Sequence, residues 1–239
     1  MVIGFHAVEE LLQGDRTVSK VFINQNADKQ KVGVLRKYCK LKEVPMQMVP
    51  LVKLNKMSRA NHQGVVAVIS PIEYVPLEET VTRLFEAGTA PKILVADGIQ
   101  DIKNIGAIAR SCLAFDVDLL IMGTKSNAEI GDGAVKASAG ALLRLPVARV
   151  KSLSECLNYL KSWGIIQIAA SEKGQLALNN IHEKEIGGFA LWMGNEDRGL
   201  SRERLAEMDL NVAIPMSEKI DSLNVSVAAG VILYELTRR

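Results

Sequence analysis

The sequence predicts an α/β protein of two domains, a small one followed by a larger one built on a parallel sheet. Three observations lead to this fold class: short apolar runs alternate with helical patterns, two prolines interrupt the alternation near residue 71, and the balance of charge changes there. Apolar runs that alternate with helices are typical of strands buried on both faces of a parallel sheet. A chain of 239 residues is long enough for two modest domains.

The first domain is expected at residues 1–70, as a small α/β layer. Helical periodicity covers 6–12 and 28–38, and strand-like patterns cover 18–23, 46–49 and 65–69. Short elements in this order fit one sheet with helices packed on it.

Residues 71–77 are predicted to be a linker. Pro71 and Pro76 bracket an acidic residue, and this pair forbids a continuous helix or a central strand. The second domain is then expected at 78–239.

The second domain repeats a strand and helix alternation. Strands are expected at 93–96, 119–122, 165–169, 190–193 and 210–214, and helices at 105–114, 135–142, 153–163, 202–208 and 225–236. Ligands of such sheets bind beyond the carboxyl ends of the strands. The polar residues that follow these strands are therefore the candidates for a functional site.

The net charge of +2, from 29 basic and 27 acidic residues, conceals an asymmetry. Residues 1–70 hold 11 basic and 5 acidic side chains, which gives +6, and the remainder holds 18 and 22, which gives −4. Such a split indicates a basic module that meets nucleic acid or another anion.

Several classes of protein are excluded by what the sequence lacks. Cys39, Cys112 and Cys156 are widely spaced and contain no C-x-x-C pair, which argues against a disulfide framework or a thiolate zinc site and fits a reducing cytoplasm. No secretory signal is visible, and the longest apolar stretch, 225–233, is far shorter than the ~20 residues of a membrane span. A cytoplasmic protein is therefore expected.

Nucleotide-binding and hydrolytic motifs are also missing. No G-x-G-x-x-G fingerprint follows a predicted strand, and Leu200 stands where the phosphate loop needs its lysine. His6, His62 and His182 lie far apart, and neither a G-x-S-x-G elbow nor an H-E-x-x-H helix is present. The sequence predicts no metal site.

Three polar segments remain, each at the end of a predicted strand. In the first, Asn104 is placed to cap a helix, Gly106 permits close backbone approach, and Arg110 lies mid-helix among small apolar residues. A buried guanidinium there needs a partner, whereas an Arg that reaches solvent does not. Both interpretations are open on this segment alone.

The second and third segments have the same ambiguity. At 194–201 a buried strand runs into a Gly-bracketed polar turn, which is either a functional loop or a tight turn with Glu196 in solvent. At 214–230 Pro215 ends a strand and Asn224 is placed to cap a helix rich in small residues, which also suits a plain helix–helix contact.

Together these segments resemble the SpoU (TrmH-type) class of SPOUT RNA 2′-O-ribose methyltransferases. The motifs of that family read Asn-x-Gly-x-x-x-Arg, Gly-x-Glu-x-x-Gly-Leu, and Ile-Pro-Met followed by Ser-Leu-Asn-Val-Ser-Val-Ala. They correspond here to 104–110, 194–200, 214–216 and 222–228. Residues 4–8 and 62–65 resemble the ends of the small ribosomal-protein-like RNA-binding domain found in the branch with bacterial 23S rRNA methylases, and 136–141 matches a further stretch.

The resemblance implies a trefoil knot in the second domain, S-adenosylmethionine as the cofactor, and a homodimer in which the partner subunit completes each site. It places five residues against the cofactor: Gly194, Asn195, Ile214, Met216 and Leu223. It implies no metal and no membrane.

The resemblance also implies the catalytic residues Arg110, Asn104, Glu196, Ser222 and Asn224. A free guanidinium is a poor base. Arg110 is therefore expected to clamp the phosphate beside the target ribose, with the base role as the alternative. Glu196 is expected to pair with Arg110, and the other three to supply hydrogen bonds.

The basic first domain favours rRNA as the substrate, recognised through shape and phosphates. Two alternatives are a tRNA 2′-O-methyltransferase and a catalytically inactive RNA-binding or ribosome-assembly protein of the same fold. Three positions depart from the family pattern: Ile102 replaces a common Pro, while Asp197 and Glu218 replace common Gly residues. Gly takes positive φ more readily than either carboxylate residue.

Overall fold

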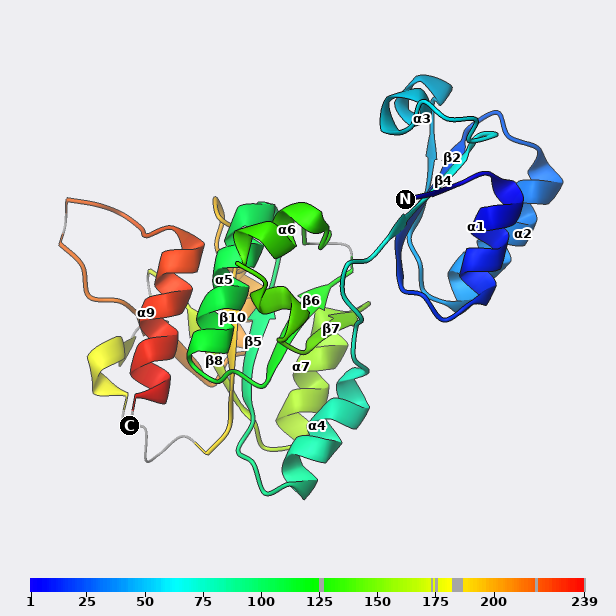
Figure 1. Ribbon diagram of the computed structural model, residues 1–239. Coiled ribbons are helices and arrows are strands. Elements are labelled where there is room, and N and C mark those ends of the chain that lie inside the picture. Colours follow the sequence, from blue (N-terminus) through cyan, green and yellow to red (C-terminus); the bar gives the residue numbers. More distant parts are fainter. Residues whose placement is uncertain (125–126, 173, 175, 182–186, 218, 239) are drawn as a thin grey trace. The chain divides into compact units, whose positions relative to one another are not determined.

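The structure is a computed structural model that describes all residues except 125–126, 173, 175, 182–186, 218 and 239 (Figure 1). The chain divides into two units, Met1–Glu73 and Tyr74–Arg239. The division falls inside the segment 71–77.

The first unit is a four-stranded sheet with three helices. Its elements in chain order are β1 (Val2–Ile3), α1 (Phe5–Gln13), β2 (Val18–Asn24), α2 (Lys29–Leu41), β3 (Met46–Val49), α3 (Leu51–Met57) and β4 (Val65–Ile69). The strand order is β1-β4-β2-β3, with β2 parallel to β3 and β4 antiparallel to both of its neighbours.

Successive side chains of β2 point to opposite faces of this sheet. Val21 and Ile23 belong to the apolar cluster that α1 and α2 cover, whereas Phe22 packs with Leu54 of α3 on the other face. This division follows from the two-residue repeat of a strand. The sheet is therefore covered by two long helices on one face and by a single short helix on the other.

The second unit is a seven-stranded parallel sheet in the order β7-β6-β5-β10-β8-β11-β9. Its strands are β5 (Lys92–Ala96), β6 (Leu119–Gly123), β7 (Val147–Val150), β8 (Ile166–Ala170), β9 (Leu176–Ala177), β10 (Phe189–Met193) and β11 (Leu210–Ala213). Its helices are α4 (Leu77–Glu86), α5 (Ile102–Ala114), α6 (Asp132–Ala137), α7 (Leu153–Ser162), α8 (Arg202–Ala206) and α9 (Val225–Thr237), with 3₁₀ turns η1 (Ala141–Leu143) and η2 (Leu178–Asn180).

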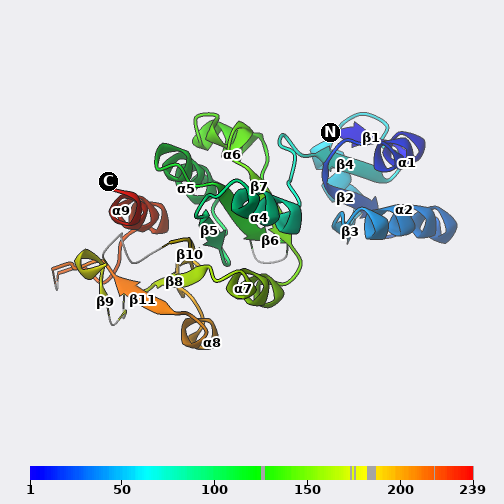
Figure 2. The same cartoon turned by 90° about the horizontal axis from the view of Figure 1, so that it is seen from below.

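Helices cover both faces of the seven-stranded sheet. Figure 2 shows α5 and α9 on one side of it and α7 and α8 on the other. Leu157 and Leu160 of α7 pack with Val95 and Trp192 of the central strands in one buried cluster. The predicted fold class, a parallel-sheet α/β domain after a small α/β domain, is confirmed. The trefoil knot stays a prediction.

The prediction of a helix at 135–142 is wrong for the second half of that range. The helix α6 ends at Ala137, and the next turn has Ala139 at φ 50° and Gly140 at φ 83° before η1 begins. Left-handed residues cannot continue a right-handed helix. The turn instead brings Ala137 against α5, where a Cβ on Gly106 would lie 2.6 Å from the Cβ of Ala137. The close approach expected at Gly106 is therefore present.

The sequence patterns missed the 3₁₀ turn η2 and five helices and strands: β1, α3, α4, β7 and β9. Four of these five are short or lie at a sheet edge. Among the described residues, no helix combines the length and the hydropathy that crossing a bilayer requires.

Candidate active site

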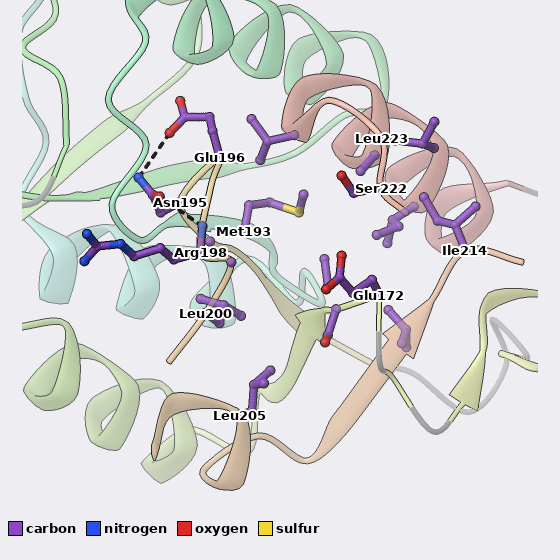
Figure 3. Close-up of a pocket in the computed structure, with 18 of the residues that line it drawn as sticks. Glu172, Met193, Asn195, Glu196, Arg198, Leu200, Leu205, Ile214, Ser222 and Leu223 are labelled. Atoms are coloured by element: carbon purple, nitrogen blue, oxygen red, sulfur yellow. Dashed lines mark hydrogen bonds between the residues drawn. The ribbon is translucent and has the colours of Figure 1, made fainter. Parts of the chain in front are cut away.

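A cavity of about 370 Å³ opens at the carboxyl ends of β8, β10 and β11 (Figure 3). Those ends are Ala170, Met193 and Ala213. The second and third motifs both contribute to its lining. This is the edge of the sheet where the sequence predicted a site.

The cavity is lined by polar and apolar groups in about equal measure. Its apolar lining includes Met193, Leu200, Leu205, Val212, Ile214, Leu223 and Ile232. All five residues expected against the cofactor line it: Gly194, Asn195, Ile214, Met216 and Leu223. Of the five expected catalytic residues, Glu196 and Ser222 line it, while Asn104, Arg110 and Asn224 do not.

The loop after β10 folds back on itself because of two glycines. A Cβ on Gly194 would lie 2.2 Å from the carbonyl carbon of Gly199, which has φ 64°. Asn195 and Gly199 exchange two backbone hydrogen bonds, at 3.1 and 2.9 Å. Only glycine fits at position 194, because any side chain there would meet the backbone of the returning loop.

The side chain of Asn195 holds this loop from inside. Its Oδ1 accepts hydrogen bonds from the backbone N–H groups of Asp197 and Arg198, and its Nδ2 donates to the carbonyl of Gly98 at 2.8 Å. Asp197 is not among the residues with positive φ. Replacing the family's Gly by Asp there therefore needs no strained backbone. Glu218, the other such position, lies outside the described residues.

Glu196 joins the loop after β10 to the start of α5. Its carboxylate accepts hydrogen bonds from the backbone N–H groups of Gln100 and Asp101, at 3.2 and 3.1 Å, and from Nδ2 of Asn104 at 3.1 Å. Burial alone would raise the pKa of Glu196, but these donors outweigh it, and the pKa lies below its usual value. The carboxylate is held in its charged form.

Asn104 carries the connection on to α9. The Oδ1 of Asn104 accepts a hydrogen bond from Nδ2 of Asn224 at 3.1 Å, and Oδ1 of Asn224 accepts one from the backbone N–H of Ser226 at 2.9 Å. Asn224 caps α9 as predicted. A continuous chain of hydrogen bonds, which we call the motif bridge (Glu196, Asn104, Asn224), thus links all three motifs beside the cavity.

One sequence-based interpretation of the first motif is wrong, and a second is not met within one chain. The N-cap of α5 is Asp101, whose side chain accepts from the N–H of Lys103, and Asn104 lies one turn inside the helix. The carboxylate of Glu196 is engaged by Asn104 and backbone donors, and no ion pair joins it to Arg110 among the described residues.

Arg110 lies on the exposed face of α5. Six residues separate it from Asn104, which turns it to another side of the helix and ~9 Å along the axis. The guanidinium therefore reaches solvent, as the plainer of the two interpretations had it. Within one chain, Arg110 does not complete the cavity.

Sequence reasoning missed several residues that shape the site. Asn127 accepts from the N–H of Ile99 and donates to the carbonyl of Ala96, which fixes the loop after β5. Arg204 of α8 binds Asp97 at 3.4 Å, and its guanidinium lies 4.9 Å from the centre of the Trp192 ring. Asp97 follows a buried strand directly, and this position was the signal that could have identified it.

The arrangement suits a ligand with an extended apolar part held against backbone groups. Among the described residues, no three His, Cys, Asp or Glu side chains are grouped as metal ligands would be.

Residues 91–234 match the family model described as the SpoU rRNA Methylase family. The chain belongs to the SpoU rRNA methylase family.

This SpoU methylase is thus an RNA methyltransferase of the SpoU/TrmH type. Residues 1–75 match the model for RNA 2′-O ribose methyltransferase substrate binding. A Staphylococcus epidermidis protein whose name assigns it to the TrmH family tRNA/rRNA methyltransferases is 30% identical over 239 residues, which are 100% of this chain and 95% of that protein.

Solved structures of related proteins have the same fold. The SpoU methyltransferase AviRb from Streptomyces viridochromogenes, in complex with AdoMet, is 24% identical with a TM-score of 0.62, covering 99% of this chain and 88% of that one. An AdoMet-bound rRNA methyltransferase from Sinorhizobium meliloti is 21% identical with a TM-score of 0.63, covering 99% and 86%.

Proposed function

We propose that this SpoU methylase transfers a methyl group from S-adenosylmethionine to a ribose 2′-hydroxyl of rRNA, and that it acts as a homodimer. The observation that carries the proposal is the motif bridge, which holds the three family motifs together at the rim of one cavity. Two solved relatives contain AdoMet.

The cavity fits such a cofactor. Its volume of about 370 Å³ lies in the range of small-molecule sites, and Leu200, Ile214 and Leu223 offer apolar walls for a purine. The loop that begins at Gly194 adds polar side chains to the lining, those of Asn195 and Glu196 among them. When bound, the cofactor supplies an electrophilic methyl group on a sulfonium.

The residues of the chain then have to align the attacking hydroxyl with that methyl group. Glu196 and Asn104 fix the start of α5 relative to the loop after β10, and Asn224 fixes the start of α9. Ser222 lies at the rim of the same cavity. Preorganised geometry of this kind is the main contribution expected of an enzyme in a displacement reaction.

Arg110 would take part in the reaction at the cavity of the second subunit of a homodimer. Three exposed apolar side chains follow one face of α9: Val227, Val231 and Tyr234 are 51, 39 and 56% exposed. The helix α9 packs on α5, where Phe115 contacts the Tyr234 ring edge-on. A two-fold contact through this surface, which we call the α5/α9 face, would bury it and carry each Arg110 toward the other subunit's cavity.

The first unit supports an RNA substrate. Its +6 balance within residues 1–70 gives an attraction to phosphates that the rest of the chain, residues 71–239 at −4, lacks. Folded rRNA offers the extended phosphate surface that such a unit can use.

The test is methyl transfer with separate substrates. Purified protein is incubated with radiolabelled S-adenosylmethionine and either rRNA or tRNA lacking 2′-O-methyl groups, and the nucleosides are resolved by mass spectrometry. We expect one 2′-O-methylated nucleoside in rRNA. A product only in tRNA would redirect the proposal to that substrate, and a base-methylated or absent product would contradict it.

A further inference from the structure

Glu172 is a cavity-lining residue that none of the three motifs contains. It follows β8, whose neighbours in the sheet are β10 and β11, so it stands between the loops that begin at Gly194 and Ile214. Figure 3 shows its side chain pointing from the end of β8 into the cavity.

The carboxylate of Glu172 has no hydrogen-bond or ion-pair partner among the residues that the structure describes. Another carboxylate that lines the cavity, that of Glu196, is engaged by backbone and side-chain donors. The nearby walls at Val212 and Ile214 are apolar. The side chain of Glu172 is exposed at the cavity, so both oxygens of its carboxylate can accept hydrogen bonds from a ligand that enters.

The position of Glu172 indicates which group of the proposed cofactor its carboxylate would contact. The motif bridge begins at α5, which follows β5, so the reacting methyl group belongs on that side of the cavity. In the strand order β5-β10-β8-β11, two strands lie between β5 and β11. The apolar walls near Glu172, at Val212 and Ile214, belong to β11 and the residue that follows it. Those walls suit adenine, and the part of the cofactor attached to adenine is its ribose.

We propose that Glu172 accepts hydrogen bonds from the ribose hydroxyls of the cofactor's adenosine. The inference rests on the proposed function. Two neighbouring hydroxyls match the two oxygens of one carboxylate. An acidic residue beyond the carboxyl end of a parallel strand binds the ribose of dinucleotides in the same manner. Glu172 is thus a residue that determines specificity for ribonucleosides.

The experiment compares three ligands by isothermal titration calorimetry on the full chain: S-adenosylmethionine, S-adenosylhomocysteine and 5′-methylthioadenosine. All three have the ribose, the first two have the ammonium group, and only the first has the sulfonium. We expect Glu172→Ala to weaken all three alike, by roughly 10- to 100-fold, as for the loss of hydrogen bonds to a charged group. Glu155→Gln, at an exposed position on α7, removes one charge far from the cavity lining and should change none of them.

Three results would overturn the inference. Unchanged affinity in Glu172→Ala would exclude any contact. A loss that spares 5′-methylthioadenosine would assign Glu172 to the ammonium group, and a loss confined to S-adenosylmethionine would assign it to the sulfonium. A wild-type protein that binds none of the ligands would contradict the proposed function itself, and the inference with it.

Discussion

Glu196 is the residue on which the geometry of the site depends most. Its carboxylate is the common acceptor for the backbone of Gln100 and Asp101 and for the side chain of Asn104. These donors lower its pKa in the folded state against the opposing effect of burial. A group whose folded pKa is lowered stabilises the fold above its unfolded pKa, about 4.3 for Glu, and loses that contribution as the pH falls through the folded value.

Glu196→Gln should therefore destabilise the protein in a pH-dependent way. At pH 7 we expect the free energy of unfolding to fall by about 1–2 kcal/mol, since the amide NH₂ cannot accept from the donors that the carboxylate satisfied. The difference from wild type should shrink as the pH falls below about 4.3, where the unfolded chain begins to take up the proton, and should be lost once the folded carboxylate is protonated at a lower pH. Urea denaturation at a series of pH values measures it. A difference that stays constant with pH would show that the charge is not what matters, and Glu155→Gln is the matched control.

At the residue scale, the sequence identified the members of the site but not their partners. Spacing placed Asn104, Glu196 and Asn224 at strand ends and helix starts, where they lie. It could not show that Glu196 binds Asn104 and not Arg110, because that depends on which side of α5 faces the loop after β10. The start of α5 at Ile102, earlier than the pattern suggested, moved Asn104 from the cap into the first turn.

At the scale of elements, the fold of the loop from Gly194 to Leu200 requires glycine at position 194. A Cβ at position 194 would meet backbone atoms of Gly199 and Leu200 at 2.2 and 2.4 Å. Backbone cannot rotate away as a side chain can. The loop would have to open, and with it the wall of the cavity.

Gly194→Ala should therefore lower stability and ligand affinity together. We expect a loss of about 3 kcal/mol, at the upper end for overpacked sites, and a fall in Tm of about 6–12 °C for a chain of this size. Differential scanning calorimetry with and without S-adenosylhomocysteine measures both effects. Gly131→Ala is the control, because a Cβ there has no neighbour within 4 Å. Equal behaviour of the two variants would show that the loop adapts.

The elements that the sequence did not reveal share a physical reason. The helix α3 buries only Leu54, and a single buried residue cannot produce a periodic apolar pattern. The strands β1 and β9 have two residues each and exist only through their pairing with β4 and β11. The helix α4 is different: its buried residues Leu77, Thr80 and Val81 follow helical spacing, and its signal lay directly after Pro76. Long buried strands were predicted almost to the residue because their apolar runs are continuous.

At the scale of the whole molecule, the separation of Arg110 from the cavity is the feature that one chain does not explain. The cavity, the motif bridge and the loop at Gly194 are complete within one subunit. Arg110 is exposed on α5, the helix against which α9 packs. The proposed dimer through the α5/α9 face would account for both observations, because it would bury the stripe and supply the guanidinium from the second subunit.

Mixed dimers test this arrangement directly. Arg110→Ala should abolish methyl transfer and leave S-adenosylhomocysteine affinity near normal, whereas Ile214→Asp should abolish binding by placing a charge in the apolar wall. Each variant alone is then inactive. If Arg110 acts on the other subunit's cavity, co-expression of the two with different affinity tags restores one intact site per mixed dimer. With random pairing that is about a quarter of wild-type activity.

Purified mixed dimers, selected through both tags, should reach about half of the wild-type rate, because one of their two sites is intact. An Arg110 that served its own subunit would leave these dimers inactive, since neither chain would then hold both a functional cavity and a functional guanidinium. Val231→Glu, which puts a charge into the exposed stripe, should give monomers by sedimentation and the same loss of methyl transfer as Arg110→Ala. Active monomers would exclude a site shared between subunits.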